Sequence, residues 1–167
     1  MILAVDVDYR LDGGAIAAGV LFRDWPSDVA QQTLIRRIGQ VSPYRPGFFF
    51  ERELPCILDL LSDMAVKPET VIVDGYVYLG AERRAGLGAR LFEALGETVP
   101  VVGVAKTRFG DTPRRTEVFR GGSARPLFVT AAGMDEDVAR DRVRSMHGPF
   151  RTPAMLSAVD RACRDAV

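Results

Sequence analysis

Hydrophobic residues in the first third of the chain recur in short runs that are separated by polar turns. Residues 1–9 and 15–22 are rich in β-branched and small apolar side chains, and a polar, glycine-containing turn at residues 12–14 separates them. This pattern predicts two antiparallel strands joined as a hairpin. Residues 29–41 alternate in part between apolar and polar positions, which favours a third antiparallel strand, although a short helix also fits.

The hydrophobic pattern changes to a helical period at residues 51–65, where apolar side chains recur three or four positions apart. Pro55 falls near the start of this segment, where a helix tolerates a missing N–H group. A buried β-branched strand at residues 70–73, a helix at 86–95 and another buried strand at 99–104 follow. The middle of the chain therefore alternates strand and helix.

The last third of the chain predicts a second hairpin and two closing helices. Residues 117–120 and 126–130 flank a Gly-Gly-Ser turn, and residues 135–146 and 153–163 have helical patterns. Three hairpin-joined strands followed by helix, strand, helix, strand describe a mixed sheet with helices on its faces. We therefore predict an α/β fold of the ribonuclease H-like class, with a mixed five-stranded sheet flanked by helices.

Composition sets limits on the kind of protein this is. The 167 residues, 47% of them hydrophobic, predict a single domain over residues 1–167. Lys plus Arg and Asp plus Glu both number 22, so nucleic-acid binding would need local basic patches. Cys56 and Cys163 lie in apolar, helix-patterned segments, which predicts buried thiols in a reducing compartment. Because we identify no signal peptide or membrane span, we expect a cytoplasmic protein without membrane contact.

Asp6 interrupts the first apolar strand, where a carboxylate is costly. A buried carboxylate needs a metal, a cation or backbone donors as a partner. The alternative is that Asp6 lies near the strand end and only pairs with an arginine. Asp8 lies two positions further on, so both acids share a face of the sheet and either could be the ligand. We favour Asp6.

Two further acids occupy positions where a sheet gathers ligands. Asp74 ends the strand at residues 70–73 and precedes Gly75, although Asp-Gly is also a common turn pair. Glu53 lies in the first turn of a helix, where the helix dipole alone explains an acid, and Glu51 competes with it. Together, Asp6, Glu53 and Asp74 would suit a hard cation such as Mg²⁺ or Mn²⁺, which can activate water against a phosphodiester.

Four stretches of the chain form an ordered set: Ala4-Val5-Asp6-Val7-Asp8-Tyr9, Pro43-Tyr44-Arg45-Pro46-Gly47-Phe48-Phe49-Phe50-Glu51-Arg52-Glu53-Leu54-Pro55, Val73-Asp74-Gly75 and Val102-Gly103-Val104-Ala105-Lys106-Thr107. They resemble motifs of the endonuclease V family, and a weaker match lies at residues 148–153. In the second stretch the motif continues as Phe-Arg-Glu, which selects Glu53 rather than Glu51 as the catalytic glutamate. The resemblance implies catalytic roles for Asp6 and Asp74 as well, and places Lys106 near a phosphate or the attacking water.

The family resemblance implies a metal-dependent nuclease that recognises deaminated purines, chiefly inosine, in DNA or RNA. Tyr44, held between Pro43 and Pro46, resembles a wedge that enters the duplex where a base is flipped out. Gly75 would let the main chain approach that base. We expect at least two of the three phenylalanines at residues 48–50 to belong to the core.

The chain departs from the family pattern at two places. Residues 76–86 keep an arginine pair, Arg83 and Arg84, as candidate substrate-binding residues, but lack the family's histidine and hold one extra residue. The family's Gly-His after the strand at residues 127–130 is also missing. Asp135 or Asp137 could replace it as the fourth metal ligand, although a helix N-cap explains Asp135 equally simply. His147, the one histidine, fits a helix end.

Our leading hypothesis is therefore a metal-dependent endonuclease, and two alternatives remain. A binding module that kept the fold but lost base-specific cleavage explains the departures, and a small-molecule phosphohydrolase explains the acids alone. Basic side chains could form a local groove for nucleic acid, although ordinary solvated faces explain most of them. These are Arg36, Arg37, Arg45, Arg52, Arg83, Arg84, Lys106, Arg108, Arg114, Arg115, Arg120 and Arg125.

Overall fold

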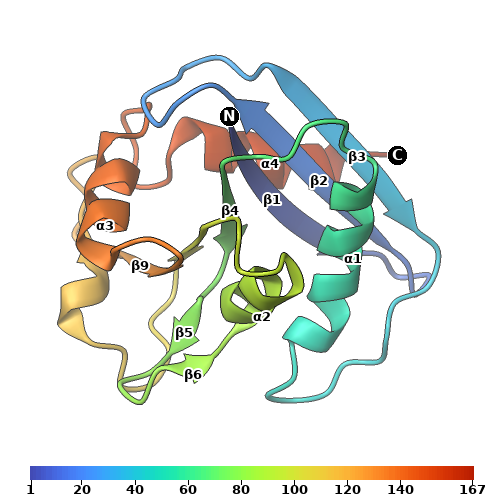
Figure 1. The fold of residues 1–167 in the computed structure, drawn as a ribbon, viewed down its shortest axis with the longest axis horizontal. Helices are drawn as coiled ribbons and strands as arrows, with labels where there is room; N and C mark the ends of the chain where they lie inside the picture. Colours follow the sequence, from blue (N-terminus) through green and yellow to red (C-terminus); the bar gives the residue numbers. More distant parts are fainter.

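The computed structural model describes all residues from 1 to 167 and begins with three antiparallel strands. Strands β1 (Ile2–Tyr9), β2 (Ala15–Phe22) and β3 (Gln32–Ile38) form a meander (Figure 1). The two hairpin strands and the third strand predicted from the sequence are thus confirmed, and the short-helix alternative for residues 29–41 is wrong. Of these three strands, β2 alone is buried along its whole length, and it lies between β1 and β3.

The central strands run parallel to β1. Strand β4 (Thr70–Asp74) pairs with β1, and β7 (Val101–Ala105) pairs with β4. Strands β9 (Leu127–Ala132) and β8 (Glu117–Val118) then extend the sheet antiparallel, after a 3₁₀ turn η1 at Arg114–Thr116. The α/β class is confirmed, but the sheet has seven strands in the order β3-β2-β1-β4-β7-β9-β8 and not five. The hairpin predicted near residues 117–130 supplies the additional two.

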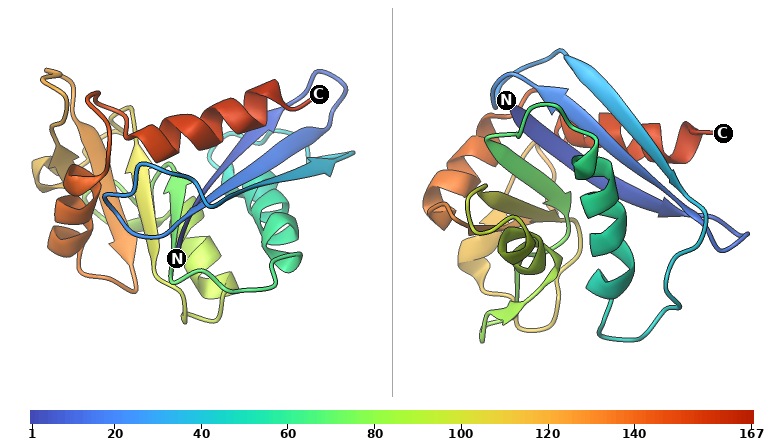
Figure 2. Two further views of the ribbon diagram at one scale, coloured as in Figure 1. Left: turned by 90° about the horizontal axis from the view of Figure 1, so that it is seen from above. Right: turned by 45° about the vertical axis from the view of Figure 1, so that its right-hand side comes forward.

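Four helices cover the two faces of the sheet. Helices α1 (Phe50–Ser62) and α2 (Leu87–Ala94) lie on one face, and α3 (Glu136–Ser145) and α4 (Ala154–Asp165) on the other (Figure 2). Each face buries its own apolar cluster of 18 residues. None of the helices is long and apolar enough to span a bilayer.

A short ribbon after β4 was not predicted from the sequence. Strands β5 (Tyr78–Leu79) and β6 (Arg84–Ala85) pair with each other outside the main sheet. The chain reaches this ribbon by crossing over Gly103, where an added Cβ would lie 2.5 Å from the carbonyl oxygen of Gly75 and 2.7 Å from the amide nitrogen of Val77. A side chain at position 103 would therefore block the path from β4 to the ribbon.

Strand register brings the carboxyl ends of β1, β4 and β7 to one edge of the sheet. Val5 pairs with Val73, and Asp74 pairs with Val104. Asp6 is therefore next to Asp74 across the parallel pair, and Lys106 directly follows the end of β7. Ligand sites in open α/β sheets form at this kind of edge.

Candidate functional site

Asp6 and Asp74 share a narrow pocket beneath helix α4 with Lys106. The Nζ atom of Lys106 donates a hydrogen bond to Oδ2 of Asp74 at 2.9 Å. Thr152, just before α4, and Leu156, within it, complete the wall on the helix side. The structure thus brings together three charged residues from neighbouring strands: Asp6 within β1, Asp74 at the end of β4 and Lys106 directly after β7.

Burial makes Asp6 an unusual carboxyl group. Its neighbours Ile2 and Ala4 at even positions pack on the α4 side of the sheet, so Asp6 faces the same side. Burial, reinforced by the charge of Asp74, raises the pKa of Asp6 to about 6, and the hydrogen bond from the Val7 N–H opposes this shift. Asp8 shares the face, as the two-residue step requires, but pairs with Arg10 at 3.2 Å.

Glu53 approaches the same strand ends from helix α1, on the opposite face of the sheet. Its side chain is buried at 5% exposure, and its Oε2 atom has no hydrogen-bond partner. Burial, together with the charges of Asp6 and Asp74, raises the pKa of Glu53 to about 8. Glu51, the competing acid, is instead paired with Arg45 at 3.0 Å, which agrees with the choice of Glu53.

Asp160 is an acid of the site that sequence reasoning missed. It lies on α4, and its charge raises the pKa of both Asp6 and Lys106. Burial lowers the pKa of Lys106, but the hydrogen bond and charge of Asp74 outweigh burial and give a net increase. The only sequence signal for Asp160 is an acid directly after the core residue Val159, which is common on amphipathic helices.

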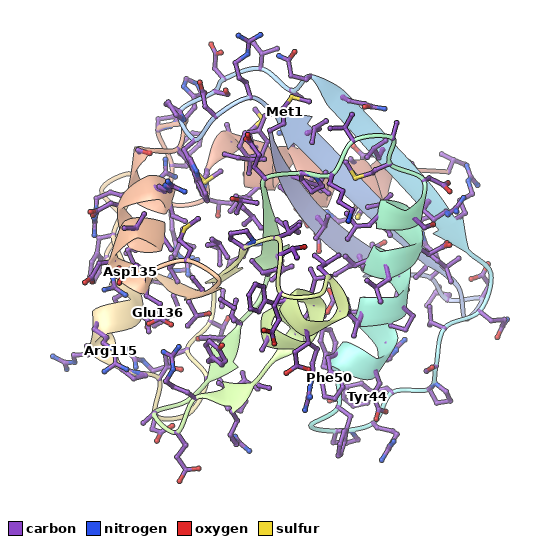
Figure 3. The ribbon with its side chains drawn as sticks, viewed as in Figure 1. Met1, Tyr44, Phe50, Arg115, Asp135 and Glu136 are labelled. Carbon is purple, nitrogen blue, oxygen red and sulfur yellow. The ribbon has the colours of Figure 1, made fainter.

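Asp135, a candidate fourth metal ligand, has a different role in the structure. Its side chain caps helix α3 by accepting from the N–H groups of Asp137 and Val138 at 2.8 and 3.2 Å. Figure 3 shows Asp135 and Glu136 together at the start of α3. The charges that act on Asp6 and Glu53 come from other residues. The structure therefore does not bring Asp135 to the site, and the N-cap alternative explains it.

The donor set suits a hard cation, but it does not form a closed cage. Carboxylate oxygens are the ligands that Mg²⁺ and Mn²⁺ prefer. The buried Oε2 atom of Glu53 accepts no hydrogen bond. However, no three His, Cys, Asp or Glu side chains lie close enough to hold one ion together. Asp74 lines the pockets on both faces of the sheet and so connects Asp6 with Glu53.

The loop before α1 carries several exposed aromatic rings. Tyr44 is 59% exposed between the exposed prolines at positions 43 and 46. Phe48 and Phe49 are 43% and 48% exposed, so the expectation that at least two of the three phenylalanines are core residues is wrong. Figure 3 shows Tyr44 and Phe50 near each other at the start of α1. The loop thus presents flat apolar surfaces to solvent at the same end of the molecule as the acids.

A pocket of about 180 Å³ connects this aromatic loop with the acids. Phe49, Glu53, Asp74 and Gly75 all line it. Gly75 has a φ of +139°, a backbone conformation that L side chains rarely adopt, and a Cβ there would meet nothing within 4 Å. The main chain at Gly75 is therefore open to a close approach from this pocket.

Comparison with known proteins identifies the family. A sequence model described as endonuclease V matches residues 1–147. Endonuclease V of Streptomyces coelicolor is 37% identical over 155 residues, which cover 88% of this chain and 59% of that protein. This chain belongs to the endonuclease V family. It spans 59% of the length of that relative, so the activity of longer members is not transferred to it directly.

Solved endonuclease V structures share the fold described above. That of Streptomyces avermitilis has a TM-score of 0.79 at 26% identity and covers 98% of this chain and 79% of its own. That of Ciona intestinalis, in complex with a 23mer DNA containing an inosine followed by a ribo-adenosine, has a TM-score of 0.78 at 18% identity, with coverage of 98% and 83%. The ribonuclease H-like fold class is therefore confirmed.

The endonuclease V chain described here departs from the family pattern where the β5–β6 ribbon forms. Arg83 adopts a φ of +53°, and its Nη1 donates to Oε1 of Glu136 at 2.8 Å. Its guanidinium also lies 4.3 Å from the centre of the Tyr78 ring. Arg84 is exposed and lies 5.9 Å from the centre of the Phe109 ring. Of the two predicted substrate-binding arginines, only Arg84 is without an acidic partner.

Proposed function

We propose that residues 1–167 form one endonuclease V domain, which hydrolyses phosphodiester bonds in DNA or RNA containing inosine or a related deaminated purine. Family membership supports the reaction class. The observation that carries the proposal for this chain is the group of acids at the sheet edge, where the buried Oε2 atom of Glu53 has no hydrogen-bond partner. Because both cysteines are free and buried, we further propose a reducing, cytoplasmic location.

We propose that Asp6, Glu53 and Asp74, with Asp160 nearby, hold Mg²⁺ or Mn²⁺. Burial, together with the charges of neighbouring acids, raises the pKa values of Asp6 and Glu53, and a divalent cation would favour their ionised forms. When bound, such an ion lowers the pKa of water and stabilises charge on a phosphate. Lys106, held at 2.9 Å from Asp74, would supply a further positive charge to the phosphate.

The aromatic loop and the 180 Å³ pocket would bind the lesion. We propose that Tyr44 stacks where the flipped base leaves the duplex, since its ring is exposed and flanked by rigid prolines. The base itself would enter the pocket beside Gly75, where the backbone can approach its edge. The acids that line the same pocket then lie next to the sugar–phosphate backbone of the flipped nucleotide.

A non-cleaving binding module is the second candidate, and one observation favours it. No three metal-ligating side chains are close enough to share an ion, and Asp74 already forms an ion pair with Lys106. A chain with this arrangement could bind the lesion through Tyr44 and the pocket without hydrolysing it.

Cleavage assays with matched substrates would separate these two functions. The purified protein is incubated with end-labelled DNA and RNA strands that carry one inosine or one guanosine, in Mg²⁺, Mn²⁺ or a chelator. Asp74→Asn is the site variant, and Asp141→Asn is the control because Asp141 is an exposed acid on α3. Mn²⁺ binding to each protein is measured separately by electron paramagnetic resonance.

Inosine-dependent cleavage that needs metal and is lost in Asp74→Asn but kept in Asp141→Asn would support the nuclease. Tight, inosine-selective binding without cleavage in any metal would support the binding module instead. Cleavage that survives Asp74→Asn would overturn the assignment of the metal site.

A further inference from the structure

Arg151 connects the segment between α3 and α4 to the end of strand β7. Its Nη2 atom donates hydrogen bonds to the carbonyl oxygens of Lys106 and Pro126, the latter at 2.9 Å. No carboxylate pairs with it. The guanidinium therefore serves two backbone carbonyls, one of which belongs to the lysine that contacts Asp74.

A second arginine fixes the segment that carries Arg151. Arg120 follows β8 and is buried at 8% exposure. Its Nη1 donates to the carbonyls of Phe150 at 2.9 Å and Arg151 at 3.2 Å, and its Nη2 donates to those of Met146 and Gly148. An arginine bound to several carbonyls of one segment leaves that segment little freedom, because moving it would leave buried donors and acceptors without partners.

The backbone of Lys106 is held on both sides by this arrangement. On one side its own carbonyl accepts from Arg151. On the other, the carbonyl of the next residue, Thr107, accepts a hydrogen bond of 2.8 Å from the hydroxyl of the buried Tyr76. The lysine side chain leaves this fixed backbone toward Asp74, and Thr152, directly after Arg151, lines the same pocket.

We propose that Arg151 is a positioning residue, which holds the carbonyl of Lys106 and thereby directs the Lys106 ammonium group at Asp74. The proposal rests on the proposed function as far as cleavage is concerned, but the contact itself is independent of it. Without Arg151 the carbonyl of Lys106 loses its donor, and the nearest remaining backbone anchor is the Tyr76 bond to the Thr107 carbonyl. The ammonium group then samples directions away from Asp74 and from a bound phosphate.

The lysine content of the chain permits a direct test that needs no activity. Lys67 and Lys106 are the two lysines, and Lys67 is exposed. Reductive methylation with ¹³C-formaldehyde therefore labels these two side chains and the N-terminal amine, and Lys67→Arg assigns the signals. The labelled proteins are wild type, Arg151→Ala and Arg144→Ala, the last being a matched control because Arg144 is an exposed arginine on α3.

We expect the Lys106 signal of Arg151→Ala to move toward the exposed position of Lys67, and the same shift in Asp74→Asn, labelled as the reference for a lost Lys106–Asp74 contact. The Lys67 signal stays unchanged, and Arg144→Ala reproduces wild type. Millimolar methylguanidinium should restore the Lys106 signal of Arg151→Ala by filling the vacated space. An unchanged Lys106 signal in Arg151→Ala would overturn the proposal. If that variant does not fold, Arg151→Gln, which keeps one donor group and adds no lysine, is measured in its place with the same criterion.

Cleavage kinetics provide the second readout. A positioning role predicts that kcat for the inosine substrate falls roughly tenfold to a hundredfold in Arg151→Ala, while KM changes little. Equal effects in Arg144→Ala, or a loss expressed in KM alone, would contradict it. If the wild-type protein cleaves no substrate, the proposed function fails, and the Lys106 signal still decides the role of Arg151.

Discussion

Glu53 illustrates how a single residue reveals a site. A buried carboxylate without a donor is costly, and folding tolerates it only where another requirement overrides stability. Here the unpartnered Oε2 of Glu53 lies within electrostatic reach of Asp6 and Asp74. The acidic neighbour Glu51 has an arginine partner. The two glutamates are two positions apart, yet only one of them is left without a partner.

The pH dependence of stability follows from this burial. In the unfolded chain both Glu53 and Asp6 lose their protons at about pH 4, whereas in the fold their pKa values are raised to about 8 and about 6. The folded state therefore binds more protons than the unfolded state across this window, and stability falls as pH rises through it. We expect metal-free wild-type protein to lose a few kcal/mol of unfolding free energy between pH 4 and pH 8.

Replacing Glu53 by Gln tests the sign of this effect. The amide cannot ionise, so Glu53→Gln should exceed wild type in stability at pH 8 and approach it at pH 5. The remaining decline should lie below about pH 6, where Asp6 titrates. Urea unfolding in chelator at several pH values measures this, with Glu51→Gln as the control that keeps the full slope. If the unfolding free energies of wild type and Glu53→Gln change in parallel with pH, folding does not raise the pKa of Glu53.

At the level of elements, hydrophobic period predicted the hairpins, the parallel strands and all four helices. The ribbon at residues 78–85 was missed because two-residue strands leave no periodic signal. Glu53 was selected by a motif, since its position in a first helical turn has an ordinary explanation. Asp160 was missed because an acid beside one core residue on a helix is unremarkable until the helix is docked. Its contribution depends on how α4 lies over β1, which no local pattern specifies.

The loop at residues 43–49 yields a prediction for Tyr44. Its ring is exposed, as are those of Phe48 and Phe49, so its removal should not affect the core. If the Tyr44 ring replaces the stacking that a flipped base loses, Tyr44→Ala lowers the binding free energy of the duplex by about 1–3 kcal/mol. We expect at least roughly tenfold slower cleavage or weaker binding of duplex inosine substrate, with Tyr44→Phe near wild type. Comparable losses on single-stranded substrate would argue against a wedge.

The crossing of residues 75–77 over β7 yields a prediction for Gly103. A methyl group there would meet backbone atoms of Gly75 and Val77 at 2.5 and 2.7 Å, which cannot move as a flexible side chain would. We expect Gly103→Ala to lower the free energy of unfolding by about 1–3 kcal/mol or more. Gly39→Ala is the control, because a Cβ there meets nothing within 4 Å. Chemical denaturation of both variants measures the difference, and equal midpoints would contradict the crossing.

For the whole molecule, basic and acidic residues are equal in number, at 22 each, and many of the basic side chains are paired with acids. Of the groups considered as a nucleic-acid groove, Arg36, Arg45 and Arg83 are paired with acids. Lys106 and Arg108 are also paired, and Arg120 is buried against carbonyls. The members that remain exposed without an acidic partner are Arg37, Arg84, Arg114, Arg115 and Arg125.

Salt dependence of binding should report which of these arginines contact phosphate. Figure 3 shows Arg115 and Tyr44 toward one end of the molecule and Met1, at the start of β1, toward the other. Each phosphate contact contributes about −0.9 to the slope of log K against log salt on duplex DNA. We expect Arg115→Ala to reduce the magnitude of this slope by about 1. Arg23→Ala should leave it unchanged, because Arg23 is exposed after β2 at the edge opposite Asp6. Fluorescence anisotropy with an inosine-containing duplex over a salt series measures both slopes. Equal slopes for Arg115→Ala and wild type would show that Arg115, in η1, does not contact phosphate.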